Sequence, residues 1–244
     1  PMIYEFWRFD AGPLPAPVEH VVPPDGLVSI WALRRIDGGV FCGVTGPSAR
    51  ASRPIVENGM TIVGVRAKPG APARFFSLPL PAIAGKMVPL AIAAPGVSAD
   101  FERAAHSAFS GDYAALETLF DRLDVASPAG DKAIESMAQA IIDAHGEGEI
   151  RAHSASVGLS PKAARVRFRA VTGLNPKDFS RVRRIRRACM EALKAGAGWS
   201  AVSLEAGFAD QAHLARECRD IFEMTPRDLR RALTTIRHGA VYSA

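Results

Sequence analysis

Two stretches in the C-terminal half of the chain repeat the same order of polar and apolar positions. The first covers residues 150–171 and the second covers residues 199–222. Each starts with a short helical pattern, passes through a glycine-containing turn, and ends in a longer helix with a single apolar stripe. Glycine permits the left-handed conformation of such a turn, which sets the second helix across the first. The pattern therefore predicts two helix-turn-helix modules in tandem.

The longer helix of the first module is expected over residues 160–171. Ser160 is a favourable N-cap, and Pro161 suits the first helical position. The apolar stripe, spaced i, i+4, i+7, consists of Ala164, Phe168 and Val171. The positions left outside this stripe are Lys162, Ala163, Arg165, Val166 and Arg169.

The longer helix of the second module is expected over residues 210–222. Its apolar stripe consists of Leu214, Cys218, Ile221 and Phe222. The positions left outside the stripe are Gln211, Ala212, His213, Ala215, Arg216 and Arg219. His213 either reaches a phosphate or base or hydrogen-bonds a neighbouring helix, and the structural role is slightly favoured.

A helix-turn-helix presents its second helix to the major groove of DNA. Lys162, Arg165 and Arg216 are suited to guanine, because Lys and Arg donate to its O6 and N7 atoms. Gln211 is suited to adenine, and Ala212 is suited to contact with a thymine methyl group. The alternative for the basic residues is a contact with phosphate alone, which positions a helix without reading sequence.

The charge distribution favours a polyphosphate partner. Residues 130–244 contain 19 Lys and Arg against 13 Asp and Glu, a net charge of +6, whereas residues 1–129 contain 11 against 12, a net charge of −1. Between residues 151 and 187, 11 basic residues accompany one acidic residue, Asp178. Such a field strengthens binding to nucleic acid through counterion release. A solvated charged surface is the alternative interpretation.

Between the two modules, residues 178–194 predict a connecting helix with one apolar stripe. Arginines occupy much of the rest: Arg181, Arg183, Arg184, Arg186 and Arg187. The helix is expected to fix the distance between the modules. Some of these arginines are candidates for contact with the DNA backbone, and most are expected to be solvated or paired with nearby acids. Trp199, at the start of the second module, is expected to be a core residue.

The first hundred residues hold most of the prolines and predict short strands separated by Pro- and Gly-containing turns. The expected strands are 3–9, 18–22, 27–33, 40–45 and 60–66. Helices are expected at 101–109 and 113–123, and residues 127–130 form a candidate linker. Beyond the linker, a helical stripe is formed by Ile134, Met137, Ala138, Ile141 and Ile142. The tail from Thr235 is expected to be loosely held.

The expected fold class is α+β with two domains. Residues 1–126 are expected to form a small β-barrel or sandwich followed by helices. Residues 131–234 are expected to be entirely helical. Three widely spaced cysteines favour neither a disulfide framework nor a zinc site, and Cys189 and Cys218 fit apolar helix faces. No apolar run approaches the length of a membrane helix, and no signal-peptide pattern occurs, so a cytoplasmic protein is expected.

The C-terminal half resembles the DNA-binding domain of AraC/XylS-type regulators. The first part of the resemblance rests on Gly158-Leu159-Ser160-Pro161, on Phe168-Arg169, on the segment Thr172 to Phe179 and on the arginine-rich helix after it. The second part rests on the segments Trp199 to Val202, Gly207-Phe208, Asp210 to Leu214, Arg216-Glu217 and Met224-Thr225-Pro226. The resemblance covers about residues 131–233.

This resemblance implies seven helices, a double helix-turn-helix fold and a transcriptional regulator. It also implies that eight residues occupy positions where family members meet bases: Lys162, Ala163, Arg165, Val166, Gln211, Ala212, His213 and Arg216. Val166 departs from the pattern, since Arg is common there. Arg167 stands where many members have Leu.

The N-terminal half is similar to the sensor-like β domain of one branch of this family. The segments that carry the similarity are 22–26, 43–47, 64–70 and 88–90. Ligands of that domain are generally unassigned, so the similarity implies a fold and not a chemistry.

Few residues suggest catalysis or metal binding. None of the six histidines forms a ligand pair of the usual spacing, and Glu19-His20 is a weak candidate. No phosphate-binding loop and no hydrolase or metalloprotease motif is present. Arg66 and Lys68 either line the opening of an anion-binding site or lie at a solvated strand end. The solvated strand end is the favoured interpretation. Four aromatic residues of the expected strands either line an apolar pocket or belong to the core: Tyr4, Phe6, Trp7 and Trp31. A place in the core is the favoured interpretation.

The sequence therefore predicts a transcription regulator that reads two successive major grooves with helices 160–171 and 210–222. No enzymatic activity, cofactor or metal is expected. The expected partner is double-stranded DNA. Further candidate partners are a small-molecule effector in the N-terminal domain, RNA polymerase and a second copy of the chain. No association with a membrane is expected. The rivals are a constitutive architectural DNA-binding protein and, less favoured, an enzyme with its site in the β domain.

Overall fold

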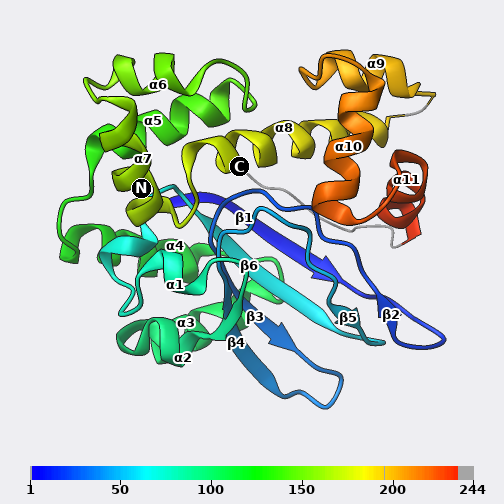
Figure 1. The fold of residues 1–244 in the computed structure, drawn as a ribbon. Helices are drawn as coiled ribbons and strands as arrows, with labels where there is room; N and C mark the ends of the chain where they lie inside the picture. Colours follow the sequence, from blue (N-terminus) through cyan, green and yellow to red (C-terminus); the bar gives the residue numbers. More distant parts are fainter. Residues whose placement is uncertain (1, 195, 236–244) are drawn as a thin grey trace.

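The computed structural model describes residues 2–194 and 196–235. A β-sheet with helices on one face makes up the N-terminal half, and a second group of helices lies along its other side (Figure 1). The expectation for the tail after Thr235 lies outside the described residues.

The main sheet has five antiparallel strands in the order β1-β6-β3-β4-β7. The strands are β1 (Ile3–Asp10), β3 (Ser29–Arg34), β4 (Val40–Thr45), β6 (Thr61–Ala67) and β7 (Met87–Pro89). The sheet is open, because β1 and β7 form its two edges and do not pair with each other. Of the two expected architectures, the structure therefore forms the sandwich-like one and not the closed barrel.

Side chains alternate between the two faces of the sheet. Ile30 pairs with Val44 and Val65, and all three are fully buried on the face that the helices cover. The adjacent Trp31 lies on the opposite face, where its indole NH donates to the Thr45 hydroxyl at 2.9 Å. Successive side chains of a strand point to opposite faces, which produces this alternation.

Four helices follow and cover the first face of the sheet. They are α1 (Leu80–Ile83), α2 (Leu90–Ala93), α3 (Pro95–Ala108) and α4 (Ala114–Ala126). Phe101 and Phe120 join α3 to α4 at the centre of this core, with ring centroids 6.4 Å apart. Helix α3 begins six residues before the expected start at residue 101, because Pro95 fits the first helical turn.

Two short strands, β2 (Val18–Glu19) and β5 (Ile55–Val56), form a separate ladder. The strand expected over residues 18–22 is shorter than predicted, and Val22 makes only an isolated bridge to Ser52. Phe9 and Val56 are buried where this ladder meets the end of β1.

The C-terminal half is helical in its described part. Its helices are α5 (Lys132–Asp143), α6 (Ile150–Ser156), α7 (Pro161–Thr172), α8 (Pro176–Ala192), α9 (Trp199–Glu205), α10 (Gln211–Phe222) and α11 (Pro226–Thr235). The stripe expected on α5 is buried throughout. The long helix α8 runs between two groups of helices, with α5–α7 at one end and α9–α11 at the other (Figure 1).

Each helical group has its own core, and the N-terminal half contributes to both. Leu27 is buried among α5, α7 and the start of α8, and Val21 is buried among α8–α11. Cys189 and Cys218 belong to the second core, as expected, and burial raises the pKa of the Cys218 thiol to about 12.

None of the described helices is long and apolar enough to cross a membrane.

Glycine in β4 leaves room for an aromatic ring. A Cβ atom at Gly43 would lie 2.5 Å from the Trp31 ring. We expect Gly43→Ala to lower the free energy of unfolding by about 1–3 kcal/mol, the usual cost of overpacking. Gly96, in α3, has open space at its Cβ position, so Gly96→Ala should be neutral or stabilising. Denaturant unfolding of the two variants checks this, and equal midpoints would contradict the close packing at Gly43.

Candidate nucleic-acid interface

The first module is built from α6, a turn and α7. Gly158 adopts a positive φ of 70° in the turn, as the sequence pattern requires. The Ser160 hydroxyl accepts a hydrogen bond from the Ala163 amide at 3.3 Å, and Pro161 occupies the first turn of α7. Ala164 and Phe168 are fully buried. Helix α7 therefore begins and faces its core as predicted.

The second module repeats this construction with α9, a turn and α10. Gly207 has a positive φ of 71°, and the Asp210 carboxylate accepts from the His213 amide at 2.6 Å. The predicted stripe of α10 is buried in full: Leu214, Cys218, Ile221 and Phe222. Trp199 is partly buried against the same core, and the Arg230 guanidinium lies 4.2 Å from the centre of its ring.

The predicted contact residues lie on the outer faces of α7 and α10. The exposed ones are Lys162, Arg165, Val166, Arg169, Gln211, Ala212, Arg216 and Arg219. Ala163 and His213 are half-buried. Val166 exposes 66% of its surface. Their exposure leaves both outer faces free to meet a ligand.

Of the six exposed cations on these two helices, Arg167 binds Asp131, and the other five form no ion pair within the described residues. These are Lys162, Arg165, Arg169, Arg216 and Arg219. Unpaired cations on exposed helices are free to bind phosphate or base edges without breaking an internal bond.

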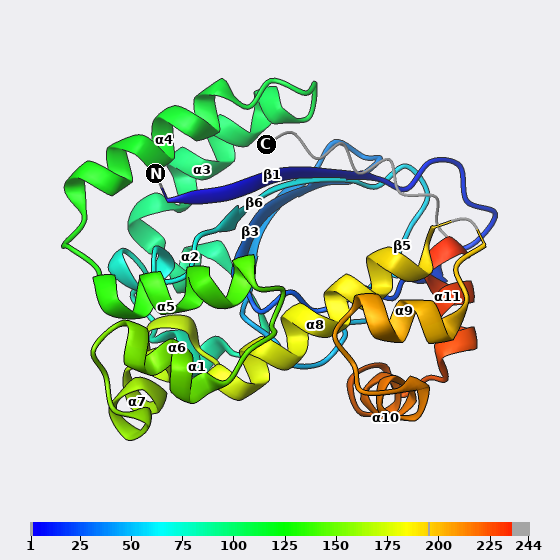
Figure 2. The ribbon, with the colours of Figure 1, turned by 90° about the horizontal axis from the view of Figure 1, so that it is seen from above.

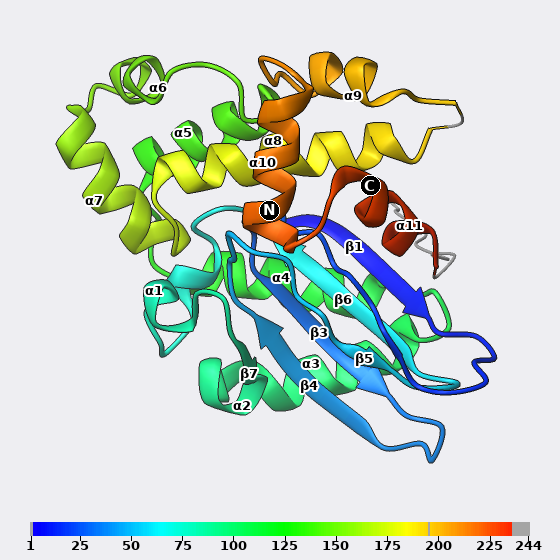
Figure 3. The same cartoon turned by 45° about the vertical axis from the view of Figure 1, so that its right-hand side comes forward.

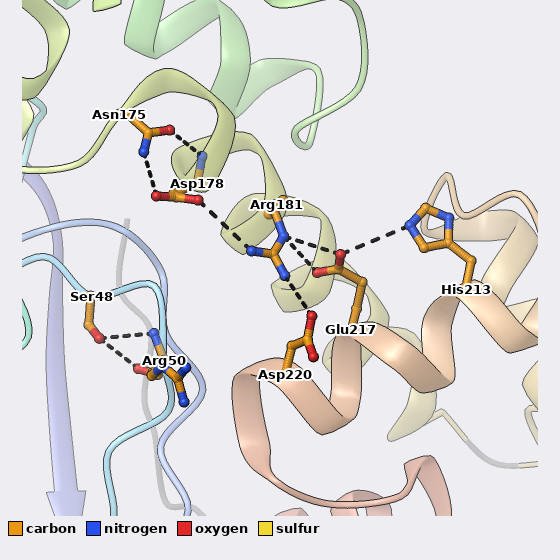
Figure 4. A network of polar contacts seen from close by, with 8 residues as sticks. All are labelled: Ser48, Arg50, Asn175, Asp178, Arg181, His213, Glu217 and Asp220. Carbon is orange, nitrogen blue, oxygen red and sulfur yellow. Dashed lines mark hydrogen bonds and ion pairs between the residues drawn. The ribbon is translucent and has the colours of Figure 1, made fainter. Parts of the chain in front are cut away.

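His213 is held by two neighbours on the second module. Its ring stacks edge-to-face on Phe208 with centroids 5.2 Å apart, and its Nε2 atom lies 4.0 Å from a Glu217 carboxylate oxygen (Figure 4). Both contacts lie within the second module and neither is a hydrogen bond to a neighbouring helix, and part of the ring stays exposed.

Glu217 also connects α10 to α8. It accepts from the Arg181 Nε atom at 3.0 and 3.1 Å, and Arg181 reaches Asp220 at 3.4 Å (Figure 4). Asp178 lies 3.9 Å from the same guanidinium. This network fixes the rotation of α10 relative to the connecting helix. Sequence reasoning did not single out Glu217, although its position four residues after His213 places both on one helix face.

Two further arginines of α8 join the two modules. Arg184 donates to the Gly146 carbonyl of the first module at 2.9 Å, and its guanidinium lies 5.8 Å from the Phe208 ring of the second. Arg187 contacts Glu147 at 2.9 Å and Glu205 at 4.0 Å. The loop after α5 and the end of α9 are therefore joined through one side chain.

The other two arginines of α8 face the N-terminal half. Arg183 is buried and donates to the Asp25 carbonyl at 3.2 Å and to the Tyr4 hydroxyl at 3.4 Å. Arg186 lies within 4.0 Å of carboxylate oxygens of Glu5 and Asp25. The connecting helix is therefore paired with internal groups along its length, and its arginines are bound within the protein.

Arg66 completes this buried cluster, with Glu5 and Asp25 as its partners. It does not lie at a solvated strand end, as had been favoured, because both carboxylates enclose its guanidinium. Lys68 lines an open hollow of about 270 Å³ between the N-terminal half and α5, together with Arg74 and Glu135.

Arg167 binds the residue that caps another helix. Its Nε and Nη2 atoms donate to Asp131 at 2.9 and 2.7 Å. Asp131 caps α5 by accepting from the Ile134 amide at 3.2 Å. Hydrogen bonds from Arg167 hold the pKa of this carboxyl below its ordinary value of 3.8. Asp131 thus fixes the start of α5 to α7.

These pairings change the meaning of the basic stretch between residues 151 and 187. Six of its 11 basic residues are paired with other groups of the protein: Arg167, Arg181, Arg183, Arg184, Arg186 and Arg187. The interpretation of the whole run as a field for nucleic acid was therefore too simple. Only the unpaired cations remain for that purpose.

In the view from above, α7 lies next to the amino-terminal end of α8 and α10 lies beside the body of α8, and both helices are at the lower edge of the molecule (Figure 2). Viewed from another side, α10 crosses in front of α8, and the N-terminal sheet lies beneath α10 and α11 (Figure 3). Two exposed helices on one side are the arrangement that successive major grooves of one duplex require.

The N-terminal half contains few features of a catalytic or metal site. In residues 2–194 and 196–235, no group of three or more His, Cys, Asp or Glu side chains could hold a metal ion. His20 is buried and stacks on Phe9 with centroids 5.4 Å apart. Trp7 and Trp31 lie against Gly64 and Gly43, and Phe6 packs against the sheet core.

Residues 154–232 match the family model described as a helix-turn-helix domain. The structure is similar to a regulator with an AraC-type DNA-binding domain from Chromobacterium violaceum, with 18% identity over 43% of this chain and 94% of that one and a TM-score of 0.39. It is similar to a probable AraC family transcriptional regulator from Rhodopseudomonas palustris CGA009, with 22% identity over 42% and 98% and a TM-score of 0.37.

A third similar structure extends over both halves of the chain. ToxT from Vibrio cholerae is 8% identical over 94% of this chain and 99% of that one, with a TM-score of 0.50. The two proteins share an overall fold. No curated protein matches the sequence. Residues 154–232 form a helix-turn-helix domain.

The pair of Arg167 and Asp131 predicts a pH dependence. A carboxyl whose pKa is lowered on folding contributes stability above its ordinary value, and this contribution disappears as the pH falls through the folded value. We expect Arg167→Gln to lower the free energy of unfolding at pH 7, and the difference from the wild type to shrink below about pH 4. Denaturant titrations at several pH values check this.

Arg151→Gln is the matched control, because Arg151 is exposed and forms no ion pair within the described residues. A difference between Arg167→Gln and wild type that stayed constant down to pH 2 would show that Asp131 is not the responsible group.

Proposed function

We propose that this protein binds a specific duplex sequence by placing α7 and α10 in two successive major grooves. The observation that carries the proposal is the pair of exposed helices at one edge of the molecule (Figure 2), with five cations that no described acid neutralises. We further propose residues 1–126 and 131–234 as the two domains, and a cytoplasmic protein without enzymatic activity.

The first reading helix is the more cationic of the two. Lys162, Arg165 and Arg169 surround the exposed Val166 on its outer face. Lys162 and Arg165 are proposed to reach guanine edges, with Arg169 on phosphate. The branched apolar side chain of Val166 is proposed to contact a thymine methyl group, the apolar feature of the major groove.

The second reading helix carries a different set of groups. Gln211 is suited to bidentate pairing with adenine, Arg216 with guanine, and Ala212 to contact with a thymine methyl. Arg219 is proposed to bind phosphate. Ala163 and His213, which are half-buried, lie at the edges of the two contact surfaces.

A small-molecule effector of the N-terminal domain, a second copy of the chain and RNA polymerase are proposed further partners. An effector changes DNA binding only by preferring one arrangement of the two domains. The buried cluster of Glu5, Asp25, Arg66, Arg183 and Arg186 is the part of the interface that such a rearrangement would have to change.

Selection from a random duplex library tests the proposal. We expect a bipartite site with two half-sites about 10 base pairs apart, centre to centre. Arg216→Ala should then lose about 1–3 kcal/mol of binding to the selected site while binding to random duplex changes little. Arg122→Ala is the control, because Arg122 is exposed on α4, remote from both modules. Uniform coverage of duplex without a selected sequence would favour an architectural DNA-binding protein and reject the proposal.

Replacement of thymine by uracil tests the role of Val166. Uracil lacks only the C5 methyl group, so wild-type protein should bind about fourfold more weakly at the base that Val166 contacts, the value of one buried methyl group. Val166→Ala should bind both duplexes equally, whereas Lys162→Ala should retain the preference for thymine. Competition binding measures the ratio. Equal binding of both bases by wild type at every thymine of the first half-site would exclude the contact.

A further inference from the structure

A segment of the N-terminal half extends across both DNA-binding modules. Residues 47–53, here called the brace, connect β4 to β5. Ala49 packs against the core of the first module, and Ala51 packs against the core of the second. The chain therefore passes from one module to the other within three residues.

The brace meets the first reading helix at its carboxyl end. Gly173 caps α7 in the left-handed conformation, with φ of 83°. A Cβ atom at Gly173 would lie 2.5 Å from the Pro47 side chain, so the end of α7 and the start of the brace are in close contact. Glycine serves here both for the positive φ and for the approach of Pro47.

The brace meets the second reading helix at the same end. The Ala51 amide donates to the Ile221 carbonyl at 3.0 Å, and the Arg53 guanidinium donates to the Phe222 carbonyl. These carbonyl groups belong to the last turn of α10. Carbonyl groups in the last turn of a helix have no amide partners within that helix. The partial negative charge at the carboxyl end of a helix also stabilises the Arg53 guanidinium at this position.

Internal hydrogen bonds fix the shape of the brace. The Ser48 hydroxyl donates to the Arg50 carbonyl at 2.8 Å and accepts from the Arg50 amide at 3.0 Å (Figure 4). Ser52 and Val22 exchange two backbone hydrogen bonds of 2.9 and 3.2 Å. Glu19 holds Arg53 at 3.0 Å. The segment is therefore tied to the β2–β5 ladder and is not a free loop.

The position of the brace leaves the reading faces open. It binds α10 at residues 221–222, whereas Gln211, Ala212 and Arg216 lie on earlier turns of the helix. Helix α8 connects the two modules along its own axis. A second connection between the modules restricts the rotation of one module relative to the other about this axis. The brace supplies this second connection.

We propose that residues 47–53 set the spacing and relative rotation of the two reading helices, with Ala51 and Arg53 as positioning residues. The N-terminal domain thereby determines which distance between half-sites the protein accepts. This last consequence rests on the proposed reading of two grooves. The geometry itself can be tested without DNA.

Insertion of Gly-Gly between Ala49 and Arg50 tests the geometry in the full chain. Spin labels on Ala170→Cys and Ala209→Cys, exposed positions of the first and second modules, report the distance between them. We expect one narrow distance distribution without the insertion and a clearly broader one with it. The same insertion between Gly38 and Gly39, in the β3–β4 turn, is the control and should leave the distribution narrow.

Point variants separate the role of the cation from the length of the segment. Arg53→Ala should broaden the distribution, and Arg53→Lys, which keeps a cation at the helix end, should restore it in part. Arg35→Ala is the control, since Arg35 forms a surface pair with Glu57 away from α10. Far-ultraviolet circular dichroism and unfolding midpoints establish that each variant is folded.

DNA binding supplies the second measurement. One base pair inserted between the selected half-sites should weaken wild-type binding about tenfold or more, the cost of a misplaced base contact. The Gly-Gly variant should lose much of this discrimination. Unchanged distance distributions in both the Gly-Gly variant and Arg53→Ala would overturn the proposal. Broader distributions with unchanged spacing discrimination would overturn its consequence for DNA. Broader distributions with no selectable site would support the brace and reject the proposed function.

Discussion

Five arginines project from α8, and each one ends on a group of the protein itself. Such charges are tolerated at a packed interface only where acids or carbonyls meet them, since an uncompensated charge there is strongly destabilising. The partners come from three places: the first module, the second module and the N-terminal sheet. The relative placement of all three therefore depends on the pairing of one helix, and any rearrangement must break and remake these bonds together.

This use of charge leaves the outer surface of α7 and α10 with fewer unpaired cations than the composition suggests. The free ones are concentrated on α7, where three surround Val166. On α10, acidic Asp210 and Asp220 lie at the two ends of the surface that carries Arg216 and Arg219. The first module is thus suited to strong electrostatic attachment, and the second to discrimination by an amide and a methyl group. The two modules have the same helix-turn-helix backbone but expose different side chains.

The N-terminal domain contributes to the interior of the DNA-binding half. Leu27 and Val21 are buried in the first and second helical cores, and Ala49 and Ala51 lie against the same two cores. Removal of apolar surface from water stabilises this association without a directional bond. A displacement of the N-terminal half would therefore act directly on both α7 and α10, because residues of that half are buried in the cores of both helices.

The sequence by itself determined the local elements of the helical half. Its cap Ser160 and its turn glycines, Gly158 and Gly207, act through groups within a few residues, so spacing alone locates them. Five strands were predicted from the Pro- and Gly-containing turns that separate them, whereas β5 and β7 were not predicted. Turn signals do not specify whether a sheet closes, and the open sheet could not be distinguished from a barrel.

Only the tertiary structure decided what the arginines do and how the two halves meet. Arg181 and Glu217 are 36 positions apart, and Arg183 and Tyr4 are 179 positions apart. No pattern within a helix predicts such partners, because a side chain on an exposed stripe has the same sequence signature whether it meets solvent, DNA or a distant acid. The brace was equally hidden, since its contacts depend on where two separate chain segments come together. Local periodicity fixes which face a residue occupies, whereas long-range packing decides what lies opposite that face.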